Sequence, residues 1–238
     1  MLLRAAHRFA SHLFGGTCLL CRGAADAARD EGLLCAACDA DLPRMDDALC
    51  PRCALPSPDG VLCGRCLSQP PAYDATVAAL QYRFPADVLV HALKFRGELA
   101  LAAPLGRLLG ARVARVGERV DVDCVLPVPL SAARLRARGY NQSLEIGRHA
   151  ARALSAPLAA HACERGRDTP PQSALRWDER AKNVRGAFRC TIPLQGATVA
   201  VVDDVMTTGA TLEEIAATLK RAGAARVVNW VVARTFSA

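Results

Sequence analysis

The 238-residue sequence lacks the long apolar runs that membrane-spanning helices need. No stretch of about 18 residues is apolar and free of charge, which argues against an integral membrane protein. The N-terminal segment also lacks the uninterrupted apolar core of a secretory signal, because Arg4, His7, Arg8 and His12 break it. We therefore expect a cytoplasmic protein.

Aromatic residues and lysines are also scarce. Aromatic residues make up 5% of the chain, and those in its basic part are Tyr140, Trp177 and Phe188. So few rings give little support to a surface that stacks on the bases of a single strand. The chain has three lysines, and Lys94 and Lys182 fall in motif-like stretches, which favours an ammonium over a guanidinium at those positions.

Negative charge is deficient in one part of the chain. The formal net charge is +7, and residues 134–189 alone hold 12 Lys/Arg against 5 Asp/Glu. Such a surplus indicates an anionic partner, either a phosphate-rich small molecule or nucleic acid. An ordinary solvated basic face is the alternative that charge alone leaves open.

Cysteine, in contrast, is abundant, and eight of the 11 cysteines form four C-x-x-C pairs in residues 18–66. Two such turns supply the four thiolates of a structural zinc site, so the four pairs predict two zinc ions. A disulfide framework is the competing interpretation, and it is disfavoured without a secretory signal. We expect sequential sites, although interleaved pairing is also compatible with the spacing. The ligand sets are Cys18/Cys21/Cys35/Cys38 and Cys50/Cys53/Cys63/Cys66.

A Pro-rich segment, residues 67–75, separates the cysteine-rich part from the rest of the chain and predicts a linker. We expect a double zinc ribbon with a short N-terminal helix in residues 1–69 and a second domain in residues 70–238. In the second domain, strand-like and helix-like segments alternate, which predicts an α/β fold with a parallel sheet flanked by helices. The expected strands are 76–84, 122–129, 158–165, 198–204 and 226–234, and the expected helices are 85–94, 98–116, 144–154 and 211–223.

Two adjacent carboxylates, Asp203 and Asp204, follow the apolar run that starts at Thr198. The next segment, Thr207-Thr208-Gly209-Ala210-Thr211, places backbone N–H groups and hydroxyls at the start of a helix, where a phosphate binds well. Carboxylates repel phosphate, so we expect them to accept hydrogen bonds from neighbouring sugar hydroxyls. These features predict a sugar 5-phosphate with a free cis-diol. The segment is not a P-loop, because G-x-x-x-x-G-K-[ST] is absent.

Residues 201–212, VVDDVMTTGATL, resemble the phosphoribosyl pyrophosphate (PRPP) motif of type I phosphoribosyltransferases. Together with HALKFRG (91–97), LPVPLSAARLRARGYNQS (126–143), RDTPPQSALRWDERAKNV (167–184) and the four C-x-x-C pairs, the chain is similar to the ComF/GntX family. That family combines a double zinc ribbon with a phosphoribosyltransferase domain and includes competence proteins.

The resemblance implies a site for PRPP and Mg²⁺, with the ion bridging the pyrophosphate and the ribose hydroxyls. Arg165, Arg167, Arg180 and Lys182 would belong to a flexible hood that closes over pyrophosphate as charge develops on it. The implied PRPP-binding residues are Lys94, Arg138, Asn141, Gln142, Asp203, Asp204, Thr207, Thr208, Gly209, Ala210 and Thr211.

Two functions follow from this resemblance, and they belong to different classes. The first is Mg²⁺-dependent transfer of the phosphoribosyl group to an unknown acceptor, with release of pyrophosphate. The second is a non-catalytic PRPP-binding competence protein that handles single-stranded DNA during natural transformation. A zinc ribbon that recruits protein partners is a third possibility.

Overall fold

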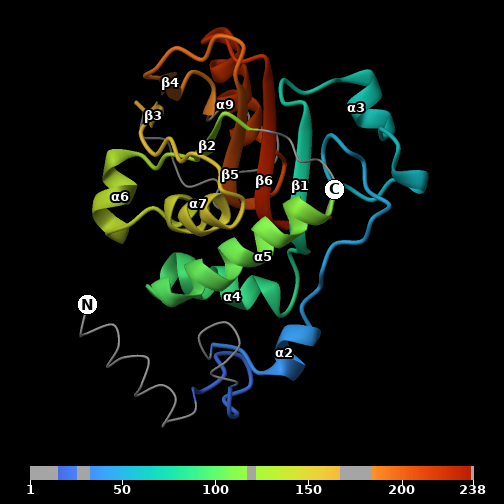
Figure 1. The fold of residues 1–238 in the computed structure, drawn as a ribbon, viewed down its shortest axis with the longest axis vertical. Helices are drawn as coiled ribbons and strands as arrows, with labels where there is room; N and C mark the ends of the chain where they lie inside the picture. The colour runs from blue at the N-terminus through green and yellow to red at the C-terminus, as the bar shows by residue number, and fades with distance from the viewer. Residues whose placement is uncertain (1–15, 26–32, 117–121, 167–183, 237–238) are drawn as a thin grey trace.

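The computed structural model of the chain describes residues 16–25, 33–116, 122–166 and 184–236. A four-stranded parallel sheet forms its centre, with the strand order β1-β6-β5-β2 (Figure 1). The strands are β1 (Ala75–Gln81), β2 (Cys124–Pro127), β5 (Thr198–Met206) and β6 (Arg226–Arg234). The predicted fold class is therefore confirmed.

Helices cover both faces of this sheet, as its apolar strands require. The helices α4 (Ala86–Phe95), α5 (Ala102–Arg115) and α7 (Gln142–Ala153) bury one face, and α9 (Ala210–Arg221) buries the other. Leu93, Leu109 and Ile146 share the first core cluster with Trp230, whereas Leu212, Ile215 and Leu219 share the second with Val201 and Val231.

Two glycines allow α5 and α7 to pack closely. A Cβ atom on Gly106 would lie 2.6 Å from both the Ile146 carbonyl oxygen and the His149 Cβ atom. A Cβ atom on Gly110 would lie 2.9 Å from that of Ala153. The close approach positions the N-terminus of α7 at the carboxyl end of the sheet, beside the residues discussed below.

The expected strand 158–165 is largely wrong. Leu158 makes one isolated parallel bridge to Val125, and the regular strand is the short β3 (Cys163–Arg165), which pairs antiparallel with β4 (Phe188–Cys190) outside the main sheet. The segment is rich in alanine, which offers little bulk to bury in a central strand. The remaining short elements are α2 (Ala36–Ala40), η2 (Pro58–Gly60), α3 (Gly64–Ser68), η3 (Leu99–Leu101) and α6 (Ala132–Arg138).

The cysteine-rich part docks directly on the edge of the sheet. The Met45 N–H donates to the Ala79 carbonyl at 3.0 Å, the Gln81 N–H donates to Pro43 at 2.7 Å, and the Thr76 N–H donates to Pro51 at 3.0 Å. These bonds occupy the free side of β1, which would otherwise present unpaired backbone groups. Among the described helices, none has the length and apolar character needed to cross a membrane.

Candidate functional site

The two aspartates lie near the carboxyl end of β5, which extends two residues further than expected, to Met206. Asp203 Oδ1 accepts hydrogen bonds from the Ser143 hydroxyl and from the Asp204 N–H, both at 2.9 Å. Asp204 is buried, and its Oδ2 lies 2.9 Å from the ammonium nitrogen of Lys94 on α4. Helices α4 and α7 thus each supply one polar group to the carboxylate pair.

The pKa values of Asp203 and Lys94 are both raised, for different physical reasons. Burial and the neighbouring charge of Asp204 raise the pKa of Asp203 to about 7, even though Lys94 and two hydrogen bonds oppose the shift. Burial alone would lower the pKa of Lys94, but the attraction of Asp204 and Asp203 prevails and raises it. Lys94 therefore stays charged beside Asp204, and the pKa of the Asp203 carboxyl lies above that of an ordinary aspartate.

The loop after β5 forms the second part of the site. Gly209 has a φ of 85° and precedes the first residue of α9, Ala210, whose N–H donates to the Thr208 hydroxyl oxygen at 3.2 Å. A Cβ atom on Gly209 would lie 2.8 Å from the Met206 methyl carbon and 3.2 Å from the Tyr73 hydroxyl oxygen, so glycine is required here. The loop therefore leads from the carboxylates of β5 to the N-terminus of a 12-residue helix, whose backbone N–H groups suit an anion.

The segment from the end of β2 to the first residue of α7 holds three of the expected ligand-binding residues. Asn141 caps α7, since its Oδ1 accepts from the N–H groups of Ser143 and Leu144, and its Nδ2 donates to the Val128 carbonyl at 3.0 Å. Arg138 donates to Gln142 Oε1. Asn141 therefore shapes the segment through bonds between its side chain and the backbone, and its contact with a ligand stays a prediction.

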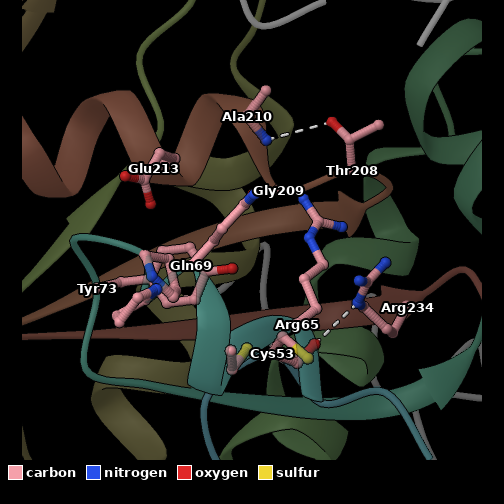
Figure 2. A pocket seen from close by; sticks show the side chains of 12 residues that line it. Cys53, Arg65, Gln69, Tyr73, Thr208, Gly209, Ala210, Glu213 and Arg234 are labelled. Atoms are coloured by element: carbon pink, nitrogen blue, oxygen red, sulfur yellow. Dashed lines mark hydrogen bonds between the residues drawn. The ribbon is translucent and has the colours of Figure 1, made fainter. Parts of the chain in front are cut away.

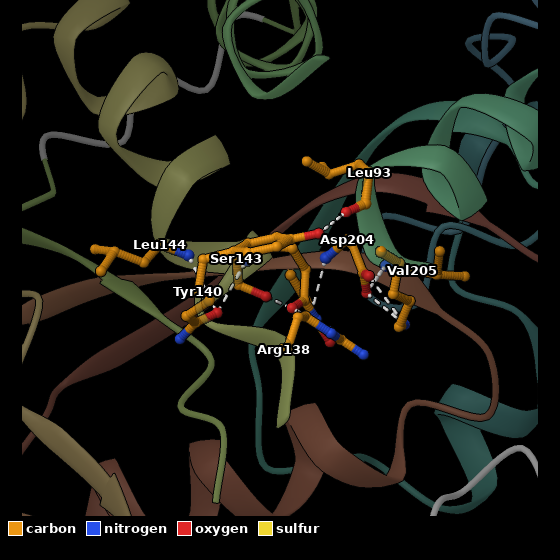
Figure 3. Close-up of polar contacts among 11 residues, drawn as sticks. Leu93, Arg138, Tyr140, Ser143, Leu144, Asp204 and Val205 are labelled. Atoms are coloured by element: carbon orange, nitrogen blue, oxygen red, sulfur yellow. Dashed lines mark hydrogen bonds and ion pairs between the residues drawn. The ribbon is translucent and has the colours of Figure 1, made fainter. Parts of the chain in front are cut away.

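Contacts with α4 fix this segment next to the carboxylates. The Tyr140 hydroxyl donates to the Leu93 carbonyl, and the Arg138 guanidinium lies 5.5 Å from the centre of the Phe95 ring. Figure 3 shows Arg138, Tyr140, Ser143 and Asp204 gathered at this edge of the sheet. The structure thus brings Lys94 and Arg138, which are distant in sequence, to the same place as the aspartates.

The expected hood is only partly described. Arg165 lies in β3, with its guanidinium 5.4 Å from the centre of the Phe188 ring. Arg167, Arg180 and Lys182 lie outside the described residues. Their proposed action on pyrophosphate therefore remains a prediction from the sequence.

The eight paired cysteines form two clusters, grouped in the sequential order expected from the spacing. Within each cluster the four sulfurs lie within 4.8 Å of one another, and the contacts from Cys21 to Cys35 and from Cys53 to Cys63 are 3.7 Å. Tetrahedral Zn²⁺ with bonds of about 2.3 Å requires sulfurs about 3.8 Å apart. The clusters therefore fit zinc, whereas a disulfide requires about 2.05 Å between sulfurs.

One thiol in each cluster has a lowered pKa, whereas the pKa values of Cys38, Cys53 and Cys66 are raised. Burial disfavours the thiolate, but backbone N–H groups override it at Cys18 and Cys50 and lower their pKa values to about 6 and about 7. Zinc binds the thiolate form, so each cluster contains at least one ligand that ionises readily. The other three cysteines, Cys124, Cys163 and Cys190, are free thiols.

Two functional neighbours escaped the sequence interpretation. Ser143 binds Asp203, and its position in the GYNQS stretch (139–143) was a usable signal because the stretch follows a strand end. Arg234, which binds the loop after β5, gave no such signal, since it is the last residue of an apolar strand.

Comparison with known proteins agrees with this geometry. Residues 9–67 match the double zinc ribbon domain, and residues 140–235 match the phosphoribosyl transferase domain. The chain is 38% identical to DNA utilization protein YhgH of Escherichia coli O157:H7 over 224 residues, which is 92% of this chain and 97% of that protein. It is 32% identical over 174 residues to Competence protein F of Haemophilus influenzae, covering 71% and 76% of the two chains. Among solved structures, the allosteric regulatory enzyme of purine biosynthesis overlaps 55% of this chain and 26% of that one, at 22% identity and a TM-score of 0.36.

Proposed function

The chain belongs to the ComF/GntX family, and we propose that it binds PRPP and transfers the phosphoribosyl group to an acceptor. The observation that carries the proposal is the carboxylate pair near the end of β5, followed after a short loop by the helix N-terminus that Gly209 opens. The loop, residues 207–211, would hold the 5-phosphate, and Asp203 and Asp204 would accept hydrogen bonds from the ribose hydroxyls.

The charges of the site suit a leaving pyrophosphate. Arg138 and Lys94 provide positive charge on the side of the carboxylates that faces the segment between β2 and α7. Mg²⁺, when it enters with the substrate, would supply positive charge that offsets the charge of the leaving pyrophosphate. The protein's own part is to position the sugar and to stabilise charge on the leaving group, as is usual when binding rather than covalent chemistry lowers the barrier.

Replacing both Asp203 and Asp204 by asparagine should weaken PRPP binding. Each carboxylate gives up a charge-assisted hydrogen bond worth about 1.5–3 kcal/mol, so affinity should fall tens-fold or more. Calorimetric titration of PRPP with Mg²⁺ into both proteins measures this, after circular dichroism shows that the variant is folded. Glu145→Gln, a change at a partly exposed carboxylate of α7, is the control and should bind PRPP like wild type. Equal affinity of the folded double variant would contradict the ribose assignment.

Catalysis is tested separately from binding. Purified protein is incubated with PRPP, Mg²⁺ and a pool of small metabolites, and pyrophosphate is measured. Release that depends on the pool identifies an acceptor and supports the transferase. If PRPP binds tightly but no pool of metabolites causes release of pyrophosphate, the non-catalytic role is favoured.

A second candidate function is contact with single-stranded DNA, and two exposed phenylalanines at the ends of α4 favour it. The rings of Phe84 and Phe95 are 74% and 61% exposed at the two ends of α4, next to Arg83 and Arg96. An exposed ring with an arginine next to it in sequence suits an unpaired base and its phosphate. The aromatics singled out from the sequence serve this role poorly, because Phe188 is buried and Tyr140 binds the Leu93 carbonyl, while Trp177 lies outside the described residues.

Phe84→Ala should weaken binding of a single-stranded oligonucleotide by about tenfold, since stacking contributes roughly 1–3 kcal/mol per base. Fluorescence anisotropy over a salt series measures affinity, and wild-type affinity should fall steeply as salt rises. Ile192→Ala, which truncates another exposed apolar side chain, is the control. A flat salt response, or equal affinity of Phe84→Ala and wild type, would remove the physical support for this function.

A further inference from the structure

A buried arginine connects the second zinc ribbon to the proposed phosphate loop. Arg234, the last residue of β6, is 3% exposed. Its Nε donates to the Cys53 carbonyl at 3.0 Å, and its Nη1 donates to the carbonyls of Met206 at 3.0 Å and Thr235 at 2.8 Å, and to that of Thr207. One side chain therefore joins a zinc-ligand turn to the first residues of the loop.

The environment of this guanidinium is unusual for a buried charge. In the described part of the chain, no carboxylate forms an ion pair with Arg234, and its partners are backbone carbonyls. Zinc held by four thiolates carries a net charge of about −2, so the second cluster supplies the nearby negative charge that a buried cation needs. Zinc thereby favours the position that Arg234 occupies.

A pocket of about 490 Å³ lies between the same two parts of the molecule (Figure 2). Its walls come from the second ribbon, including Cys66 and Arg65, and from the loop, including Thr208 and Gly209. Figure 2 shows Arg65 extending from α3 toward the loop, with Arg234 beside it. The Arg234 hydrogen bonds are therefore a direct connection between the ribbon and the loop beside this pocket.

We propose that Arg234 is a positioning residue that couples zinc binding in the second ribbon, Cys50/Cys53/Cys63/Cys66, to phosphate binding in the loop 207–211. The inference rests on the proposed function, since it concerns the same phosphate site. Zinc fixes the turn at Cys53, whose carbonyl fixes the guanidinium. The guanidinium then holds the Met206 and Thr207 carbonyls, so that the following N–H groups point at the phosphate. Coupling is reciprocal, so bound phosphate must raise the zinc affinity of this ribbon by the same factor.

The first cluster provides an internal comparison. Its described backbone bonds stay within the ribbon, for example from the Cys18 N–H to the Gly23 carbonyl at 2.8 Å and from the Leu19 N–H to Leu33 at 2.9 Å. Its buried residues pack with α4 and α5 on the other side of the molecule from α9. Coupling to the phosphate loop is therefore expected for one of the two zinc ions.

The test uses Arg234→Lys, which keeps the charge but has a single nitrogen and cannot reach the Cys53 and Met206 carbonyls together. Calorimetry with ribose 5-phosphate should show affinity reduced about tenfold in the variant, which is within the usual range of coupling between sites. Arg148→Lys, at an exposed position of α7, is the matched control and should bind like wild type. Ribose 5-phosphate is chosen because the pyrophosphate of PRPP chelates zinc itself.

The reciprocal measurement uses wild-type protein and a competing zinc chelator. Saturating ribose 5-phosphate should raise the chelator concentration needed to remove one of the two zinc ions about tenfold, and leave the other unchanged. Arg234→Lys should lose this effect. Equal ribose 5-phosphate affinity of variant and wild type, or equal zinc retention with and without the ligand, would overturn the coupling while the proposed function stands. Failure of wild type to bind either ribose 5-phosphate or PRPP would contradict the proposed function and the coupling together.

Discussion

Removing both zinc ions should unfold the cysteine-rich part and destabilise the sheet with it. The second ribbon has little core of its own, since its buried cluster consists of Cys50, Cys53 and Cys66 with Leu55, Leu62 and Cys63 packed against them. Structural zinc supplies about 10–16 kcal/mol to such small units, far more than this cluster can replace. Loss of the ribbon also uncovers the edge of β1, which residues 43–51 occupy with three backbone hydrogen bonds.

The measurement combines metal analysis with thermal unfolding. Protein never exposed to chelator should contain two zinc ions per chain, and chelation should lower Tm sharply and promote aggregation through the exposed strand. Returning Zn²⁺ should restore the original Tm, which separates metal loss from damage by the chelator. Fewer than one zinc ion per chain, or an unchanged Tm after complete removal, would contradict a structural role.

The second large effect concerns the ion pair between Lys94 and Asp204. Lys94→Met should cost about 3 kcal/mol of stability, because it leaves the Asp204 side chain, 4% exposed, without a cation. The double variant, with both Lys94→Met and Asp204→Asn, should lose less stability than the two single variants lose together, because it removes both charges. Urea unfolding of the four proteins gives the coupling energy.

A matched ion pair on the surface gives the control for this cycle. Lys220 lies 2.7 Å from Asp74, and the two side chains are 31% and 33% exposed. Lys220→Met should cost no more than about 1 kcal/mol, because solvent screens that pair. Similar costs for Lys94→Met and Lys220→Met would show that the Lys94 pair is not a buried element of the site.

Local patterns predicted most of the fold. The apolar runs at 198–204 and 226–234 became β5 and β6, and the C-x-x-C spacing predicted the two clusters in their correct order. These features succeed because strand burial, helix periodicity and ligand spacing are set by residues close in sequence. The segment 158–165 failed because its weak apolar pattern fits several conformations, and tertiary context decided among them.

The contacts that join distant parts of the chain were not accessible from the sequence. Lys94 and Asp204 are 110 residues apart, and Arg234 reaches back 181 residues to Cys53. The sequence singled out Lys94 as a ligand-binding residue, but its ion pair with Asp204 could not be foreseen. The capping bonds of Asn141 to α7 were likewise not foreseen, because they depend on where the helix begins, and its contact with a ligand stays a prediction.

The most direct test of the phosphoribosyl site is a crystal structure of the protein with PRPP and Mg²⁺. We expect the 5-phosphate within hydrogen-bond distance of the N–H groups at Gly209, Ala210 and Thr211, with the two ribose hydroxyls on Asp203 and Asp204. We expect the pyrophosphate to lie toward Arg138. A phosphate bound away from these N–H groups, or a ribose turned away from both aspartates, would contradict the proposed site.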